Sequence, residues 1–204
     1  MDTILYPSYF SPIIHYVVLA QHKNIVFEVE DHFQKQTYRN RCYIYGANGK
    51  QLLNIPVKHN NTTRKSKDVR IEYAFDWQKQ HIKTIQTAYR SSPYFEFYEE
   101  DMLALFKEKP KYLLDLNLRY QEQILELLQL DITFEKTTEY HKVYNNAMDV
   151  RRLVNAKNEQ DFSLTEYFQT FSDKHGFIEN LSILDLLFME GPNALTYLEE
   201  QEIR

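Results

Sequence analysis

Residues 3–29 read TILYPSYFSPIIHYVVLAQHKNIVFEV, and this stretch decides how the fold begins. Its apolar start over residues 3–6 predicts a strand. Ser11 and Pro12 then predict a helix start, with Ser11 as N-cap, because apolar residues recur after them at helical spacing. Residues 25–29 predict a second strand. A strand, a helix and a strand in this order favour a parallel sheet with a right-handed crossover.

The next predicted element is a β-hairpin. Residues 41–45 and 51–57 predict its strands, and they flank the sequence Gly46-Ala-Asn-Gly49. The Asn-Gly pair supplies positions at positive φ, which tight turns between strands require. Residues 69–72 and 131–135 predict further short strands.

A helical block lies between these strands. From Trp77 to Leu130 apolar residues recur at helical spacing, and prolines at positions 93 and 110 divide the stretch into three helices. Asp185 lies in a later apolar helix, where we expect its carboxylate to cap or bridge neighbouring segments. We therefore expect an α/β fold with a mixed sheet, a parallel strand–helix–strand start and a β-hairpin. Residues 1–204 would form a single domain, with the helical block of about residues 75–130 as an insertion or subdomain.

Composition excludes several classes of protein and site. Hydrophobic residues make up 43% of the 204 positions, which is ample for a core, so the chain is not disordered. Only four glycines are present, too few for a glycine-rich phosphate loop. The net charge of −5 argues against a nucleic-acid-binding protein. The single cysteine, Cys42, excludes a disulfide framework, and neither it nor the scattered histidines predict a metal site.

The N-terminal residues lack the basic stretch, the apolar run and the cleavage site of a secretory signal. The longest early apolar run is too short to cross a bilayer. We therefore expect a soluble cytoplasmic protein that binds neither a membrane nor nucleic acid.

The clearest candidate for a ligand-binding segment runs from Asp31 to Arg41. It combines guanidinium and ammonium groups with side-chain amides, which suit an anionic, hydroxyl-rich ligand such as a phosphate, a carboxylate or a nucleotide sugar. The same residues could instead form a solvated, salt-bridged rim. The candidate ligand-binding residues of this segment are Gln34, Lys35, Gln36, Arg39, Asn40 and Arg41.

Two histidines are candidates for a general base. His15 follows the first predicted strand, near the edge of the sheet where open α/β folds bind ligands. His81 shares a helical face with Trp77 and Ile85. Both could equally be structural histidines at the edge of the core.

Two further places could contact a ligand. The basic loop over residues 58–68 could close over phosphates through Arg64 and Lys65, although such a loop can also be a plain charged surface. Tyr89 and Tyr94 lie between two predicted helices and offer rings and hydroxyls to a sugar or a purine. Packing in the core would explain their rings equally well.

Several sequence blocks occur along nearly the whole chain. They are LYPSYFSP at 5–12, FQKQTYRNR at 33–41, LNIPV at 53–57, WQKQH at 77–81, YRSSPYF at 89–95 and SILDLLF at 182–188. In these blocks the chain resembles the WbqC-like protein family. The resemblance implies a role in the synthesis of O-antigen or other surface polysaccharides. It implies no particular catalytic residue or cofactor.

On this resemblance we expect an enzyme that transfers a group to or from an activated, nucleotide-linked sugar. Amide-forming acyl transfer and nucleotidyl transfer both remain open. The expected partner is a nucleotide sugar or another anionic small molecule. The competing hypothesis is a non-catalytic binding or scaffold protein of a polysaccharide-synthesis complex, which would expose an aromatic patch and bind another protein tightly.

Overall fold

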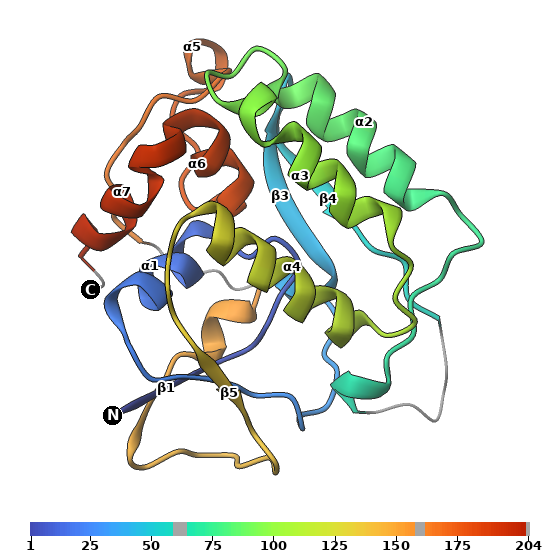
Figure 1. Ribbon diagram of the computed structural model, residues 1–204, viewed down its shortest axis with the longest axis vertical. Helices are drawn as coiled ribbons and strands as arrows, with labels where there is room; N and C mark the ends of the chain where they lie inside the picture. Colours follow the sequence, from blue (N-terminus) through green and yellow to red (C-terminus); the bar gives the residue numbers. More distant parts are fainter. Residues whose placement is uncertain (59–64, 158–161, 203–204) are drawn as a thin grey trace.

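The computed structural model describes residues 1–58, 65–157 and 162–202, which form two separate sheets with helices around them (Figure 1). The first sheet has four parallel strands in the order β5-β2-β1-β6. The expected α/β class, with its parallel strand–helix–strand start and its hairpin, is confirmed. The strands of the first sheet are β1 (Asp2–Leu5), β2 (Ile25–Phe27), β5 (Phe134–Lys136) and β6 (Ala147–Asp149).

The register of the parallel sheet places β1 between β2 and β6. Ile4 pairs with Val26 of β2 on one side and with Asp149 of β6 on the other. Strand β5 pairs with β2 on the side away from β1. It overlaps the last two residues of the strand predicted over residues 131–135. Strand β6 has no counterpart among the sequence predictions.

Helix α1 (Ile13–Gln21) connects β1 to β2, and most of its residues are buried. Its start differs from the expected one, because Pro12 rather than Ser11 is the N-cap residue. The Ser11 hydroxyl instead lies 2.6 Å from that of Ser8. The side-chain oxygen of Asn180 accepts a 3.0 Å hydrogen bond from a backbone N–H in the first turn. A segment near the far end of the chain therefore satisfies this helix terminus.

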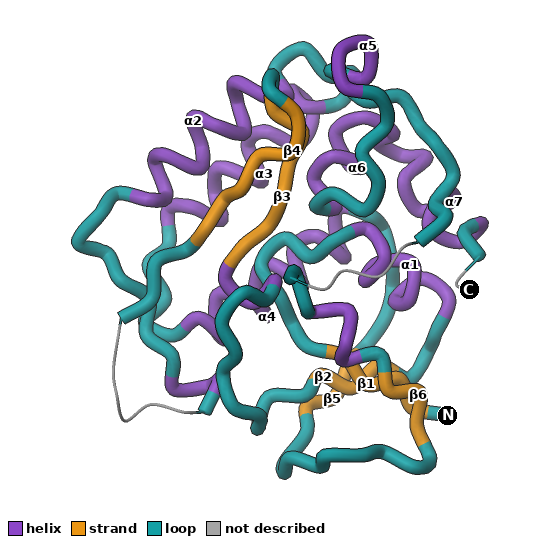
Figure 2. Tube along the Cα trace, turned by 180° about the vertical axis from the view of Figure 1, so that it is seen from behind, coloured by secondary structure: helices purple, strands orange, loops and turns teal. Residues whose placement is uncertain are grey.

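The second sheet is the predicted hairpin, with strands β3 (Arg41–Gly46) and β4 (Gly49–Asn54). Two residues form the turn between them, and Gly49 has a φ of 94°, a conformation that favours glycine. The hairpin stands apart from the parallel sheet. It packs between α2 (Trp77–Tyr89) and α6 (Ile183–Glu190), as seen from behind in Figure 2.

Residues 69–72 do not form the strand that their sequence predicts. They make only isolated bridges, including one between Val57 and Ile71. A 2.8 Å hydrogen bond from the backbone N–H of Lys58 to the carbonyl of Arg70 also joins them to the segment that follows β4. The two segments run side by side and form one wall of the groove described below.

The helical block contains the three expected helices, namely α2, α3 (Phe95–Lys107) and α4 (Leu113–Leu127). Helix α4 ends before the expected Leu130, because Gln129 takes a left-handed conformation with a φ of 56°. Aromatic rings fill the space between these helices and the segment before α1. The rings of this cluster belong to Tyr9, Phe10, Trp77, Phe106 and Tyr120.

The C-terminal segment is tied to the rest of the protein through Asp185 of α6. This fully buried carboxylate accepts hydrogen bonds from the Tyr89 hydroxyl (2.7 Å), the Tyr167 hydroxyl (2.5 Å) and the Gln169 amide (2.9 Å). The Tyr89 hydroxyl also accepts a 3.0 Å bond from the backbone N–H of Tyr45 in the hairpin. Asp185 thus bridges three parts of the fold, as predicted. The other helices of this segment are α5 (Ser172–His175), η4 (Gly191–Asn193) and α7 (Ala194–Glu200).

Replacing Asp185 by alanine should destabilise the fold. The change leaves the hydroxyls of Tyr89 and Tyr167 without their acceptor, whereas the Gln169 amide keeps the Ile178 carbonyl as an acceptor. Each lost acceptor costs about 1–3 kcal/mol, so we expect the free energy of unfolding in urea to fall by at least about 2 kcal/mol. Asp173→Ala, which removes an exposed carboxylate, is the control, and an equal loss in both variants would contradict the bridging role.

Candidate functional site

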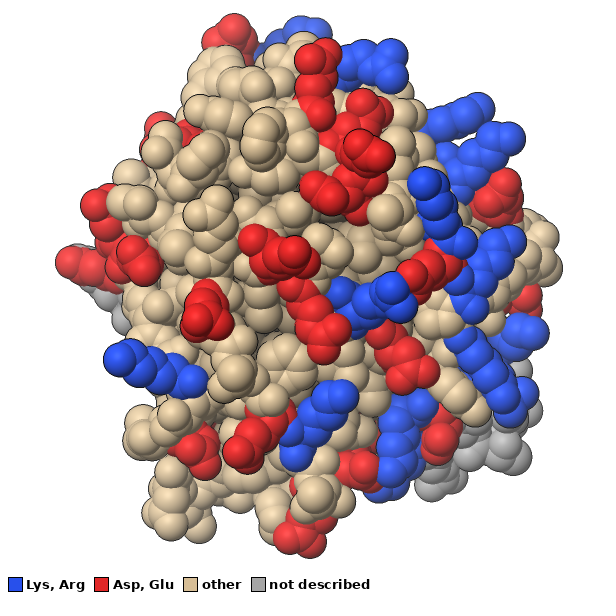
Figure 3. Space-filling model, in the orientation of Figure 1, with Lys and Arg blue, Asp and Glu red and all other residues tan. Residues whose placement is uncertain are grey.

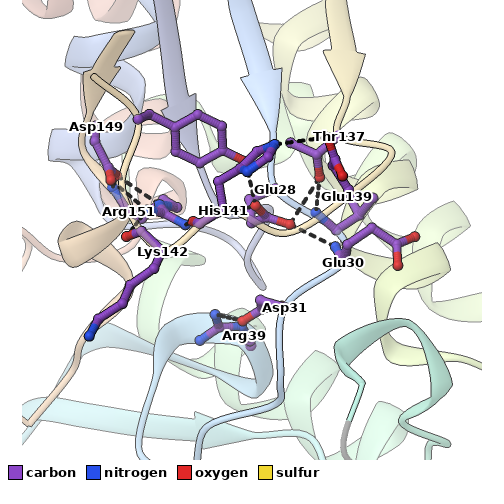
Figure 4. A network of polar contacts seen from close by, with 12 residues as sticks. Glu28, Glu30, Asp31, Arg39, Thr137, Glu139, His141, Lys142, Asp149 and Arg151 are labelled. Atoms are coloured by element: carbon purple, nitrogen blue, oxygen red, sulfur yellow. Dashed lines mark hydrogen bonds and ion pairs between the residues drawn. The ribbon is translucent and has the colours of Figure 1, made fainter. Parts of the chain in front are cut away.

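The carboxyl ends of the parallel strands gather at one edge of the first sheet. Glu28 follows β2, Thr137 follows β5, and Arg151 comes shortly after β6, at the start of η3 (Arg151–Val154). In open α/β sheets this edge is where ligands bind. Figure 4 shows the polar side chains that meet there, with the pair of Asp31 and Arg39 beside them.

Glu28 is the buried centre of this edge. Its carboxylate accepts hydrogen bonds from the Thr137 hydroxyl at 2.9 Å and from the Tyr144 hydroxyl at 2.8 Å. The guanidinium of Arg151 lies 3.8 Å away and is itself held by Asp149 at 2.6 Å, which keeps the pKa of Asp149 low. These groups satisfy one another, so we interpret them as the support of the site rather than as its ligand-binding surface.

A second buried pair lies beside Glu28. Arg39 Nη2 and Asp31 Oδ2 are 2.5 Å apart, and the two side chains are only 4% and 3% exposed. The guanidinium carbon of Arg39 lies 3.9 Å from the centre of the Tyr6 ring. Burial raises the pKa of Asp31, and the charge of Arg39 offsets this effect only in part. A carboxyl group with a raised pKa is therefore fixed at the sheet edge.

A groove of about 930 Å³ opens next to this pair. Phe33 lines both the groove and the space around Asp31, so the two are neighbours. Residues 33–41 form one wall, and residues 54–58 with 68–75 form the other. The charged side chains that line the groove are Lys35, Arg41, Lys58, Arg70, Asp68 and Glu72.

The charges of the groove favour an anionic ligand. None of its four cations forms an ion pair with an acidic side chain in the part of the chain that the structure describes. Amide side chains of Gln36, Asn40 and Asn54 add groups that bond hydroxyls. Figure 3 shows a separation of charges on one face of the protein. Acidic side chains lie over the middle of this face, and basic side chains gather along its right-hand edge.

A second hollow, of about 550 Å³, lies where the turn of the hairpin meets α2. Among the residues that the structure describes, its lining includes two lysines and no arginine. One of these, Lys50, lies with its ammonium 4.7 Å from the centre of the Tyr43 ring. We therefore place the candidate site at the larger groove, where the cations are more numerous.

The structure brings part of the predicted ligand segment together at this groove. The residues that line it are Lys35, Gln36, Asn40 and Arg41. Gln34 is exposed outside the groove lining, and Arg39 faces the buried carboxylate of Asp31 instead.

The basic loop is described again from Lys65 onward. Lys65 and Lys67 both pair with Glu30, at 3.0 and 2.6 Å, and these bonds keep the pKa of Glu30 low. The two ion pairs attach the loop to the segment that follows β2. Arg64, which we expected to cover a ligand, lies outside the described residues.

His15 and His81 are both buried away from the groove. Burial lowers the pKa of each to about 4, so both imidazoles are neutral near pH 7. His15 Nδ1 lies 3.5 Å from the Ser8 hydroxyl, and His81 Nδ1 lies 2.8 Å from the Tyr9 hydroxyl. Neither histidine lines the groove, so a base role for either would need a ligand elsewhere.

Tyr89 and Tyr94 also lie away from the groove. Tyr89 is fully buried, with its hydroxyl bonded to Asp185. Tyr94 is half-buried and packs closely against Gly191, where an added Cβ would come 2.5 Å from the ring. Core packing accounts for both rings.

Two cations of the groove were not among the expected ligand-binding residues. Lys58 begins the basic loop, and Arg70 lies between Val69 and Ile71, which are buried. That alternation of apolar and charged residues was the available signal that Arg70 faces outward. Its place across the groove from Arg41 depends on the path of the chain after β4, which no local pattern predicts.

Cys42 is buried, and burial raises the pKa of its thiol well above the usual range. In residues 1–58, 65–157 and 162–202, no three histidine, cysteine or acidic side chains are grouped so that they could hold a metal ion. The helices of the described chain include none with the length and apolar character needed to cross a membrane.

Arg39 and Arg41 should differ sharply in their effect on stability. Arg39→Ala leaves the buried Asp31 carboxylate without its partner, which typically costs about 3–5 kcal/mol. Arg41→Ala removes a half-buried side chain without an ion-pair partner among the described residues, so we expect a change within about 1 kcal/mol. Urea denaturation of the two variants checks this difference. Equal stabilities would show that the Asp31–Arg39 pair does not hold the fold.

Acid should destabilise the protein through its buried histidines. Because the folded-state pKa values are lowered from 6.5 to about 4, the unfolded chain takes up protons first as the pH falls. Each histidine then removes roughly 3 kcal/mol of stability between these two values. His15→Gln or His81→Gln should therefore lose less stability than the native chain between about pH 7 and about pH 4.5. His32→Gln, at an exposed position, is the control, and an unchanged pH dependence in the first two variants would contradict neutral burial.

Comparison with known proteins gives a match at the level of a family. Residues 7–162 match the model of the WbqC-like protein family. Neither the curated proteins nor the solved structures contain a match to the chain. The matched residues include both walls of the groove and the Asp31–Arg39 pair. Because the match covers well over half of the residues of the chain, the chain belongs to the WbqC-like protein family.

Proposed function

We propose that the protein is a group-transfer enzyme that acts on a nucleotide-linked sugar during surface-polysaccharide biosynthesis. The observation that carries this proposal is the groove with two cations on each wall, Lys35 and Arg41 on one side and Lys58 and Arg70 on the other. Their charges have no acidic partners within the described residues. The resemblance to the WbqC-like family supports a sugar as the organic part of the ligand.

A nucleotide sugar matches the groove in size and chemistry. The volume of about 930 Å³ falls within the range of about 300–1,000 Å³ that is usual for small-molecule sites. Phosphates would lie between the two walls of cations, and the amides of Gln36 and Asn40 would bond sugar hydroxyls. Phe33 and Phe75 also line the groove and offer ring faces to the base or the sugar.

Direct transfer between the two reactants fits the groove. Its lining among the described residues contains no serine, threonine, cysteine or histidine, so a covalent enzyme intermediate there would need a lysine amine or a carboxylate as nucleophile. The rate would then come from positioning the two reactants and from stabilising the charge that develops on the leaving group. Both acyl transfer to an amino sugar and nucleotidyl transfer fit this description.

Thermal unfolding with a panel of nucleotide sugars, nucleoside triphosphates and acyl-CoA donors tests the proposal. A ligand at a hundredfold excess over its Kd stabilises a protein by about 2.7 kcal/mol, which raises Tm measurably. We expect a nucleotide sugar such as UDP-glucose to raise Tm. Arg41→Ala and Arg70→Ala should each weaken its affinity at least about tenfold, because each removes charge-assisted hydrogen bonds to phosphate.

Lys23→Ala, which removes an exposed lysine outside the groove, is the matched control and should bind as tightly as the native chain. Equal weakening by Lys23→Ala and Arg41→Ala would contradict a specific site. If no member of the panel raises Tm while a pull-down recovers a stoichiometric protein partner, the proposal fails and the scaffold hypothesis is supported.

A further inference from the structure

A small cavity lies behind the groove, at the buried pair of the sheet edge. Its volume is about 10 Å³, close to the roughly 10–15 Å³ that one water molecule requires. Phe33 lines both this cavity and the groove, so the two are adjacent. The cavity therefore adjoins a ligand bound in the groove.

Four side chains that line this cavity each carry one buried polar atom without a hydrogen-bond partner among the described residues. The atoms are Asp31 Oδ1, Arg39 Nη1, Ser66 Oγ and Asn117 Oδ1. All four residues are more than nine-tenths buried. Asp31 and Asn117 are 2% exposed, Arg39 is 4% exposed and Ser66 is 8% exposed. The Ser66 hydroxyl also lies near enough to the Asp31 carboxylate to lower its pKa.

The four atoms come from parts of the chain that other contacts already fix. Arg39 Nη2 holds the second carboxylate oxygen of Asp31, and the backbone N–H of Ser66 donates to the Asp31 carbonyl at 2.9 Å. The Asn117 amide nitrogen donates to the Arg39 carbonyl at 2.8 Å. The positions of these four side chains at the cavity are therefore preformed.

The chemistry of these four side chains selects an uncharged oxygen. Asp31 and Asn117 present acceptors, Arg39 presents a donor, and Ser66 can act as either. Glu28 also lines the cavity, and its carboxylate accepts hydrogen bonds from the hydroxyls of Thr137 and Tyr144. The two carboxylates disfavour an anion, and the guanidinium of Arg39 disfavours a cation. A water molecule can donate to both acceptors and accept from Arg39 and Ser66. A hydroxyl can meet three of the four atoms.

We propose that this cavity binds one uncharged oxygen, supplied either by water or by a hydroxyl of the ligand in the groove. The hydroxyl source rests on the proposed function, whereas the water source does not. An oxygen held here lies against the buried carboxylate of Asp31, which is the arrangement that general-base catalysis requires. Neither His15 nor His81 offers such a position.

Crystal structures of the protein alone and with UDP-glucose test the proposal. In the free protein we expect one oxygen within hydrogen-bond distance of Asp31 Oδ1, Arg39 Nη1 and Asn117 Oδ1. With UDP-glucose in the groove, a sugar hydroxyl at this position supports the ligand source, and an unchanged water supports the water source. An ion, or no density there in the free protein, would overturn the proposal.

Ser66→Thr and Ser66→Val provide a matched pair of variants. The two side chains have the same shape, but only threonine keeps the hydroxyl that holds the oxygen. We expect the oxygen to persist in Ser66→Thr and to be absent in Ser66→Val, and its persistence in both would argue against the site. If the crystal structure with UDP-glucose shows an oxygen in the cavity but no UDP-glucose in the groove, the result counts against the proposed function and not against the cavity proposal.

Discussion

The buried ion pair of Asp31 and Arg39 is the interaction on which the sheet edge depends. Two charges taken out of water are stabilising only where their geometry is good and further hydrogen bonds support them. Here the Tyr6 ring lies against the guanidinium, and Asn117 of α4 bonds the Arg39 carbonyl. The backbone N–H of Ser66 bonds the Asp31 carbonyl. The pair thus joins the end of β1, the segment after β2, the basic loop and α4.

The same pair positions the groove. Arg39 lies in the short helix η1 (Tyr38–Asn40), directly before the first residue of the hairpin, so fixing its side chain also fixes Asn40 and Arg41. Asn40 donates to the Ile55 carbonyl at 3.0 Å, which holds the segment after β4 close to the first wall. A buried charge pair and an open row of charges are therefore neighbours in sequence and in space. The first gives rigidity, and the second remains available for a ligand.

Local patterns account for most of the fold. The strand–helix–strand start, the hairpin and the three helices of the block follow from periodicity and turn residues, which act over short distances. Strand β6 could not be predicted, because Ala147–Asp149 lies within a mostly polar stretch, residues 139–160, that shows no regular apolar pattern. The N-terminus of α1 could not be predicted either, since its partner Asn180 comes from the opposite end of the chain.

The candidate site was only partly accessible from sequence. The density of charged and amide residues over 34–41 indicates the first wall, but it cannot separate Arg39, which is buried, from Arg41, which faces the groove. The roles of titratable side chains are likewise ambiguous in the sequence. His15 and His81 are both candidates for a general base until the structure shows that they are buried. Arg70 joins the site through a chain path that depends on tertiary contacts. Residue type suggests chemistry, whereas burial decides which residues can perform it.

Mapping of backbone amide shifts by nuclear magnetic resonance, during titration with UDP-glucose, tests the central claim most directly. The claim is that the groove beside the Asp31–Arg39 pair is the ligand site. We expect the largest shift changes at Gln36, Asn40, Lys58 and Arg70. Changes that cluster at the hairpin turn and α2 instead, or no changes at all, would contradict this account.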